Sequence, residues 1–196
     1  GEELQPELHR STSTWREDTQ VKEYKYTKEG GFVGLSIVEE GVDKTPENIN
    51  EELTANTTDS LTAALLMMQS VREKGACEGR SEVFDGKRRF ELVFRNKGEK
   101  TLNKSRYNLY SGPAILCEVE VEPKGGEWHK RPRGWLSIQE QGRKRDYLPR
   151  LWLAHVDEDG PAVPVKVMVK TDYGALMAHL TDYDGEADFA EKEADQ

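Results

Sequence analysis

The strongest constraint in this sequence is the regular alternation of apolar and polar side chains along its second half. The alternation is clearest in Arg89–Phe94, Ile115–Glu122 and Val163–Lys170. Successive side chains of a β-strand point to opposite faces, so this pattern is typical of antiparallel strands with one apolar and one wetter face. Further strands are predicted at Trp135–Gln139, Leu148–Val156 and Tyr173–Tyr183.

Strands are also predicted before this region. Thr19–Lys28 and Phe32–Glu39 are separated by Gly30-Gly31, a pair typical of a hairpin turn. The polar stretch Gly41–Thr57 is predicted to be a loop. Later turns are expected at Asn96-Lys97-Gly98, Gly125-Gly126, Gln141-Gly142, Asp157–Gly160 and Tyr173-Gly174.

One helix is predicted, at about Ser60–Lys74. Thr57–Asp59 offers side-chain oxygens for the N-cap, and Gly75 suits the C-cap. Helical spacing predicts one apolar stripe formed by Leu61, Leu65, Met68 and Val71.

The predicted fold class is mainly β. A flat open sheet of about eight or nine strands is expected to curl or close. We therefore expect a curved antiparallel sheet or a half-open β-barrel that wraps one central α-helix. Residues 1–184 are predicted to form a single domain, and the acidic stretch 185–196 a flexible tail.

Charge and hydropathy argue against two classes of protein. A general nucleic-acid binder needs cations to displace phosphate counterions, whereas this chain has a net charge of −9. The longest apolar run, Ala63–Met68, is far shorter than the ~20 residues of a membrane-spanning helix. We therefore predict no nucleic-acid partner and no transmembrane segment.

The first candidate site is the stretch around Asp85-Gly86. This pair is expected to form a two-residue type I′ turn, with Phe84 opposite Lys87. Asp85 has no partner carboxylate or base nearby in sequence, which favours the turn over a role as a catalytic acid. The basic residues that follow are either candidate anion contacts or a solvated hairpin face: Lys87, Arg88 and Arg89.

Two other basic clusters, Lys130–Arg133 and Arg143–Arg145, lie around Trp135. Basic and aromatic residues mixed in this way can bind nucleic acid or anionic lipid head groups. In an acidic chain, solvated loop tips are the favoured interpretation.

Catalytic and metal-binding patterns are missing from the sequence. It contains no nucleophile elbow, no zinc-protease motif and no phosphate-binding loop. Its four histidines and two cysteines fit no zinc spacing. We therefore predict no catalytic residue, no metal and no cofactor; in an enzyme, Asp85, Arg88 and Tyr110 would be the first residues to examine.

The interior of the predicted sheet is the second candidate site. A curved apolar face beside a helix rich in Leu and Met can enclose an apolar ligand, or its side chains can simply form core. The candidate lining residues are Leu61, Leu65, Met68, Phe90, Phe94, Val119, Val121, Trp152 and Val165.

The two cysteines, Cys77 and Cys117, have two interpretations. In an exported protein such a pair is most simply a disulfide, and in a cytosolic protein it is most simply two buried thiols. The residues alone leave both open.

Several stretches resemble a bacterial envelope family, the domain of unknown function 3108 (DUF3108). "TTDSLTAALL" at Thr57–Leu66 and "ACEGRSEVFDGKRRFELVF" at Ala76–Phe94 are similar to its Asp-led helix, its first Cys and its hairpin. "YSGPAILCEVEVEPKGG" at Tyr110–Gly126 is similar to its second Cys-containing strand, and Leu151–Tyr183 to its closing strands. The resemblance covers Asp59 to Tyr183.

This resemblance implies export to the periplasm of a Gram-negative cell and a disulfide between Cys77 and Cys117. It also implies a curved antiparallel sheet around a helix, as in periplasmic lipoprotein carriers. It implies no activity. The family's strands upstream of the region corresponding to Trp15–Glu39 are expected to be short or missing here.

Together, these observations predict a non-enzymatic periplasmic protein of the cell envelope. We expect it to bind an apolar or amphipathic ligand, such as a lipid or a lipoprotein acyl chain, within the curved sheet. The alternative is a scaffold that holds another envelope protein.

Overall fold

The computed structural model describes residues 4–131, 134–156, 160–171 and 173–183. The chain divides into two compact units. The first unit comprises the described residues of Gly1–Leu66, Gly79–Val93 and Glu120–Leu136, and the second unit those of Met67–Glu78, Phe94–Val119 and Ser137–Gln196. The stretch 185–196, predicted to be a tail, lies outside the described residues.

The described part is mainly β, as predicted, with two antiparallel sheets and three short helices. In chain order the elements are β1 (Leu8–Trp15), β2 (Asp18–Tyr26), β3 (Phe32–Glu39), β4 (Val42–Asp43), α1 (Glu51–Thr54), α2 (Ser60–Lys74), β5 (Gly79–Phe84), β6 (Arg88–Leu102), β7 (Gly112–Gly126), α3 (Trp135–Lys144), β8 (Arg150–His155), β9 (Ala162–Thr171) and β10 (Gly174–His179).

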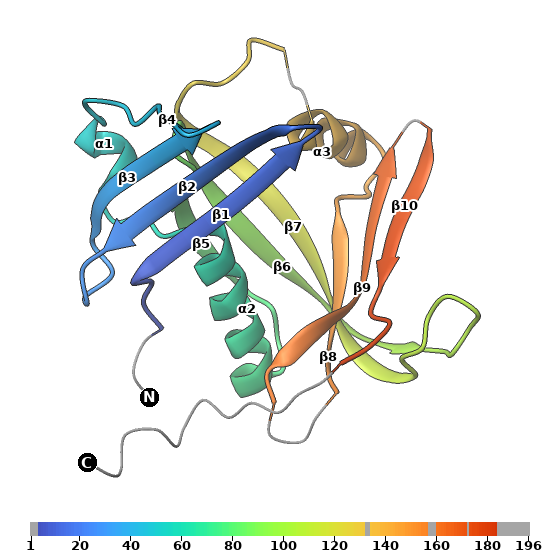
Figure 1. The fold of residues 1–196 in the computed structure, drawn as a ribbon. Helices are drawn as coiled ribbons and strands as arrows, with labels where there is room; N and C mark the ends of the chain where they lie inside the picture. Colours follow the sequence, from blue (N-terminus) through green and yellow to red (C-terminus); the bar gives the residue numbers. More distant parts are fainter. Residues whose placement is uncertain (1–3, 132–133, 157–159, 172, 184–196) are drawn as a thin grey trace, which may run out of the picture. The chain divides into compact units, whose positions relative to one another are not determined.

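The four-stranded sheet lies in the first unit and has the order β1-β2-β3-β4 (Figure 1). The predicted hairpin joins β2 to β3: Gly30 has a φ of 78°, and its N–H donates to the Thr27 carbonyl at 2.9 Å. β1 pairs with β2 along all eight of its residues, so one strand lies upstream of most of the region Trp15–Glu39; the expectation about the family's further strands stays a prediction. Almost every β1 side chain is exposed, so its sequence lacks the apolar alternation that marks the other strands.

The six-stranded sheet has the order β10-β9-β8-β7-β6-β5 (Figure 1). Within the described residues the strands form these two sheets and no closed barrel. The prediction of a turn at Asn96-Lys97-Gly98 is wrong, because β6 runs through these residues without interruption. Gly98 has its positive φ of 78° inside the strand.

Helix α2 begins and ends where the sequence predicts. Asp59 is the capping residue, since its Oδ1 accepts from the backbone N–H of Leu61 at 2.9 Å and of Thr62 at 3.1 Å. Gly75 ends the helix with a φ of 65°.

The predicted apolar stripe of α2 is wrong in its first two members. Leu61 is 61% exposed and Leu65 47% exposed. The fully buried apolar side chains are Ala63, Met67 and Val71, which are four residues apart and share a face. Several overlapping stripes fit this helix because apolar residues are spread around it, and only packing selects one.

Helix α3 corrects the prediction of a strand at Trp135–Gln139 and of a turn at Gln141-Gly142. Over five residues, the alternation of apolar side chains also fits helical spacing. Gly142 lies inside the helix, where an added Cβ would meet the Tyr147 carbonyl, so glycine permits a close backbone approach here.

Each unit has its own apolar core. In the first unit the core is aromatic: Phe84 is 1% exposed, and its ring lies edge-on to Phe32 with centroids 5.5 Å apart. This cluster also contains Tyr24, Tyr26, Leu35 and Ile37, and a second one contains Ala63, Val83 and Phe90. In the second unit the cluster contains Leu102, Ala114, Leu116, Trp152, Ala154, Val163 and Val165.

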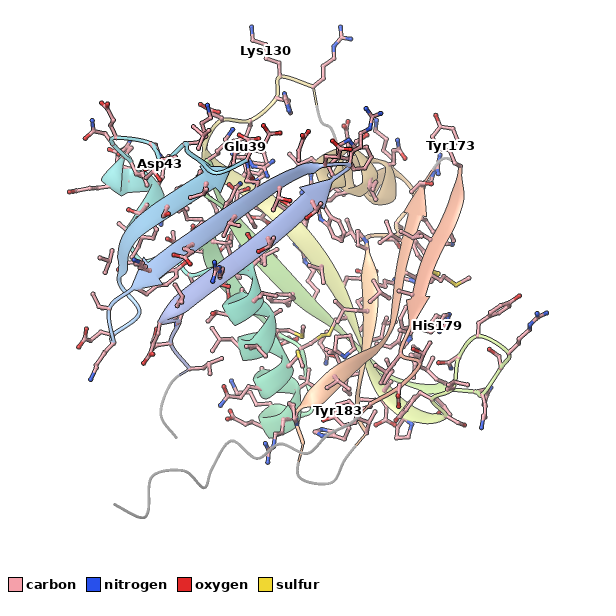
Figure 2. All side chains as sticks on the ribbon, in the orientation of Figure 1. Glu39, Asp43, Lys130, Tyr173, His179 and Tyr183 are labelled. Carbon is pink, nitrogen blue, oxygen red and sulfur yellow. A yellow bond between two sulfur atoms is a disulfide. The ribbon has the colours of Figure 1, made fainter. Side chains whose placement is uncertain are left out.

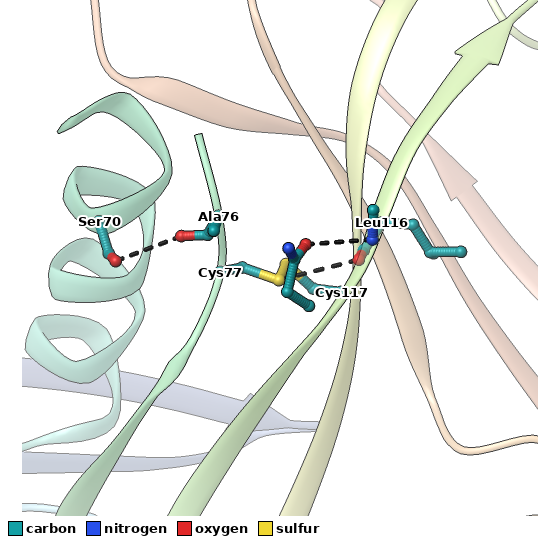
Figure 3. Close-up of a disulfide and its surroundings, with 7 residues drawn as sticks. Ser70, Ala76, Cys77, Leu116 and Cys117 are labelled. Atoms are coloured by element: carbon teal, nitrogen blue, oxygen red, sulfur yellow. Dashed lines mark hydrogen bonds between the residues drawn. A yellow bond between two sulfur atoms is a disulfide. The ribbon is translucent and has the colours of Figure 1, made fainter. Parts of the chain in front are cut away.

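The second unit is also cross-linked. Cys77 and Cys117 form a disulfide with their Cα atoms 6.0 Å apart, and both residues are completely buried (Figure 3). Next to it, the Ser70 hydroxyl donates to the Ala76 carbonyl at 3.2 Å, which ties the end of α2 to the segment that carries Cys77. The bridge therefore connects the segment after the helix to strand β7.

Candidate functional site

The β5–β6 hairpin forms at the expected place, but its loop is shifted by one residue. The Asp85 N–H donates to the Arg88 carbonyl at 3.1 Å, so Gly86 and Lys87 lie in the loop. Oδ1 of Asp85 accepts from the N–H of Lys87 at 3.1 Å and of Arg88 at 2.8 Å. Gly86 has a φ of 94°, whereas Asp85 is not in the left-handed region. The Asp85 side chain thus organises the turn, and the expected type I′ geometry is not adopted.

The hairpin tip packs on the face of the four-stranded sheet. The Tyr24 hydroxyl donates to the Asp85 carbonyl at 2.8 Å. A Cβ added to Gly86 would lie 3.1 Å from that hydroxyl and 3.2 Å from Leu35 Cδ2. Burial, together with the negative charges of Asp85 and Asp59, raises the pKa of Tyr24 to about 12, so the phenol stays a donor.

The end of β7 packs against Lys87 in the hairpin loop. A Cβ on Gly126 would overlap the Lys87 carbonyl, so only glycine allows this approach. The Glu127 N–H donates to the same carbonyl at 3.2 Å. The hairpin loop is therefore held by backbone contacts, which fixes the position of Lys87.

A polar cavity of about 380 Å³ lies beside the hairpin. Its lining residues are Lys22, Asp85, Lys87, Arg88, Glu127, Trp128 and His129. The Arg88 Nε lies 2.8 Å from Asp85 Oδ2, and its guanidinium lies over the Trp128 ring, 4.9 Å from the centroid. Trp128 Nε1 donates to the Gly125 carbonyl at 2.8 Å, so one wall of this cavity is rigidly built.

An amphipathic cavity of about 320 Å³ adjoins the polar cavity and also lies in the first unit. Its apolar lining comes from Ile37, Pro46, Ile49, Leu53 and Phe84, and its polar lining from Lys44, Asn48, Asn50, Lys87 and Glu127, with Gly86 and Gly126 completing it. Lys87 and Glu127 line both cavities. The amphipathic cavity is at the small end of the range of ligand pockets, about 300–1,000 Å³.

The structure separates the three candidate anion contacts of the hairpin. Arg88 is paired with Asp85. Arg89 Nε lies 2.9 Å from Glu82 Oε2, and its guanidinium also donates to the Glu52 carbonyl of α1. Lys87 has no ion-pair partner among the residues that the structure describes, and it lines both cavities.

Sequence reasoning missed Lys22, which lies on β2 and lines the polar cavity. It is two residues before Tyr24 and four before Tyr26, so it continues the row whose tyrosines are buried. The alternation of Lys22 with Tyr24 and Tyr26 along one strand could have predicted that the lysine lies on the same face as the two tyrosines. Trp128 and His129 gave no such signal, because they follow the end of a strand.

The nine residues predicted to line one interior cavity are distributed between the two units. Phe90 and Val121 belong to a cluster in the first unit, while Met68, Trp152 and Val165 belong to the cluster of the second unit. Phe94 and Val119 are buried, and Leu61 and Leu65 are exposed. None of the nine lines the polar or the amphipathic cavity, and their role around a ligand stays a prediction.

Neither cavity is lined by the remaining basic and catalytic candidates. Lys130 is exposed on the loop after β7, and its side chain extends into solvent (Figure 2). Residues 132–133 of its cluster lie outside the described residues, and Arg143 lies in α3 rather than in a loop. In the second unit, the Tyr110 hydroxyl donates to the Pro113 carbonyl at 2.6 Å.

The fold and the site define a class: a mainly β protein with one disulfide and, in its first unit, two adjoining cavities of ligand size. The disulfide suggests an oxidising, extracytoplasmic location. Among the described residues, no helix could span a membrane, and no group of three His, Cys, Asp or Glu side chains could hold a metal ion.

The chain belongs to the family described as "Protein of unknown function (DUF3108)", whose family model matches residues 1–181. The match includes β1 and therefore extends well to the N-terminal side of Asp59, where the region of resemblance begins. No curated protein and no solved structure matches the chain.

Proposed function

We propose that this DUF3108 protein is a non-enzymatic protein of the periplasm that binds an amphipathic ligand. The observation that carries the proposal is the amphipathic cavity, whose lining combines the apolar side chains of Ile37, Ile49, Leu53 and Phe84 with polar and charged residues. Most ligand pockets combine an apolar lining with a few polar groups that orient the ligand. The periplasmic location is supported by the disulfide.

Native mass spectrometry of the protein isolated from a bacterial periplasm tests this proposal. We expect a co-purifying mass of lipid size that is lost on denaturation and recovered by organic extraction. Leu53→Asp should abolish it, because a carboxylate would enter the apolar lining. Leu65→Asp is the matched control, since Leu65 is 47% exposed and lines neither cavity. A ligand-free wild type, or equal loss in both variants, would count against the proposal.

A second candidate function is a scaffold for another envelope protein. It is favoured by β1, an outer strand of the four-stranded sheet with eight residues, nearly all of them exposed. The free edge of such a strand can pair with a strand of another chain. A photo-crosslinking residue at Ser13 should then capture one defined protein in intact cells, whereas the same residue at Lys28 should not. Identical products at both positions would remove this candidate.

A further inference from the structure

We propose that the polar cavity is an anionic head-group site in which Lys22 and Lys87 hold the acidic end of a single-chain amphiphile. The chain of the same ligand would occupy the amphipathic cavity. This inference rests on the proposed function and goes further, because it names the class of ligand: a carboxylate or phosphate joined to one acyl or alkyl chain.

The two cavities are placed to share one ligand. Lys87 and Glu127 line both of them, so the two cavities are neighbours on either side of these residues. Ile49, Leu53 and Phe84 contribute to only the amphipathic cavity, and Lys22 and His129 to only the polar one. A molecule that lies across Lys87 therefore has an apolar environment at one end and a charged environment at the other.

The charges of the polar cavity favour an anion. Three cations and two carboxylates line it. Arg88 and Asp85 neutralise each other, which leaves Lys22 and Lys87 against Glu127. Neither lysine has an ion-pair partner in the described part of the chain. Although the chain has a net charge of −9, the polar cavity thus presents an excess of positive charge.

The groups around the proposed head group are held in place before a ligand binds. Gly126 and Glu127 fix the backbone of Lys87. Trp128 is fixed by its bond to the Gly125 carbonyl and by the edge of Phe90, with ring centroids 6.2 Å apart. A preorganised site loses less conformational entropy on binding. His129 adds a further polar group to the same cavity.

Calorimetry with delipidated protein tests the inference, using three ligands with the same twelve-carbon chain below their micelle concentrations: dodecanoate, dodecyl phosphate and uncharged monododecanoylglycerol. We expect at least one anion to bind about tenfold tighter than the neutral ligand, as one hydrogen bond to a charged group provides. The comparison of the two anions distinguishes a carboxylate from a phosphate source. Added salt should lower the affinity for the two anions and leave the affinity for the neutral ligand unchanged.

Variants separate the head-group site from the rest. The double variant Lys22→Gln/Lys87→Gln should bind the anions only as tightly as the neutral ligand. Its affinity for the neutral ligand should equal that of the wild type. Lys22→Arg with Lys87→Arg should keep most of the preference, which distinguishes lost charge from misfolding. Lys28→Gln is the control, because Lys28 is exposed in the β2–β3 loop and lines neither cavity.

The possible results are distinct. Equal binding of all three ligands overturns the head-group site but leaves the proposed function standing. Binding of none overturns both. Inorganic phosphate serves as a fourth ligand. If it binds as tightly as dodecyl phosphate, the alkyl chain of the ligand contributes nothing to the affinity, and the inference of an amphiphile is wrong.

Discussion

A buried carboxylate of the second unit and two cavity-lining lysines of the first unit differ in how their charges are compensated. In the second unit the Glu118 carboxylate is almost completely buried; it accepts from Arg150 Nη2 at 2.7 Å and lies 3.2 Å from Lys97 Nζ. In the first unit, Lys22 and Lys87 line a cavity, and neither has an ion-pair partner among the described residues. A buried charge must be paired because its desolvation is costly, whereas a charge on a cavity wall keeps its water until a ligand replaces it. Paired charges therefore stabilise the fold, and unpaired ones remain available for binding.

The largest expected effect concerns the covalent bond of the second unit. Replacing both cysteines, Cys77→Ala and Cys117→Ala, should lower the free energy of unfolding by about 4 kcal/mol, because the bridge closes a loop with a sequence separation of 40 residues. Urea denaturation with and without reductant measures this loss. Hydrogen exchange should rise more in β8 and β9 than in β2 and β3. If the reductant leaves the wild-type midpoint unchanged, the bridge does not stabilise the protein.

The next effect tests the paired charge itself. Among the described residues, Arg150→Met leaves Glu118 with Lys97 as its one ion-pair partner, and the change should cost about 3 kcal/mol in the free energy of unfolding. The matched control is Lys87→Met, which removes an unpaired cation from the first unit and should change stability by less than about 0.5 kcal/mol. Equal losses in the two variants would erase the contrast between the units.

Asp59 extends the comparison to a paired carboxylate of the first unit. It caps α2, accepts from the Thr62 hydroxyl at 2.7 Å and lies 2.9 Å from His9 Nδ1 of β1. Asp59→Ala should cost about 1–2 kcal/mol in thermal or urea unfolding. Asp59→Asn keeps a capping oxygen and should recover part of this loss. The difference in unfolding free energy that remains between Asp59→Asn and the wild type measures the contribution of the negative charge. No loss in Asp59→Ala would show that this pairing is not structural.

The smallest effect is a pH dependence in the first unit. Burial opposes ionisation of Glu91, but hydrogen bonds from Lys124 and Arg80 outweigh it and hold the pKa of Glu91 below its usual range. A carboxyl with a lowered pKa in the folded state stabilises the protein above its unfolded pKa, and this contribution is lost as the pH falls through the folded pKa. Urea midpoints between neutral and acidic pH should therefore fall less steeply in Glu91→Gln than in the wild type. A steeper fall would give the opposite sign and contradict the assignment.

Much of the fold follows from local patterns. The alternation of side chains predicts β3 and most of β2, β8 and β9, and the capping residues and Gly75 predict the limits of α2. These features depend on neighbours along the chain, so the sequence carries them directly. β1 was not predicted because its side chains are almost all exposed and show no apolar alternation. α3 was predicted as a strand because its short apolar pattern fits both strand and helix spacing.

The candidate site could be predicted only in part. The sequence identified the hairpin and its three cations, and the family resemblance identified the disulfide. It could not distinguish Lys87 from Arg88 and Arg89, because that depends on where Asp85, Glu82 and the Glu52 carbonyl lie in space.

The sequence by itself determined a mainly β chain, one well-bounded helix and a hairpin at Asp85, since hydrophobic periodicity and capping act over a few residues. Tertiary structure alone decided that Lys22 of β2 lines the same cavity as Lys87 and Trp128. It also decided which of the many charges are paired. The physical reason is that pairs such as Arg150–Glu118 and Lys124–Glu91 join segments far apart in the chain, and desolvation acts only after folding has placed them together.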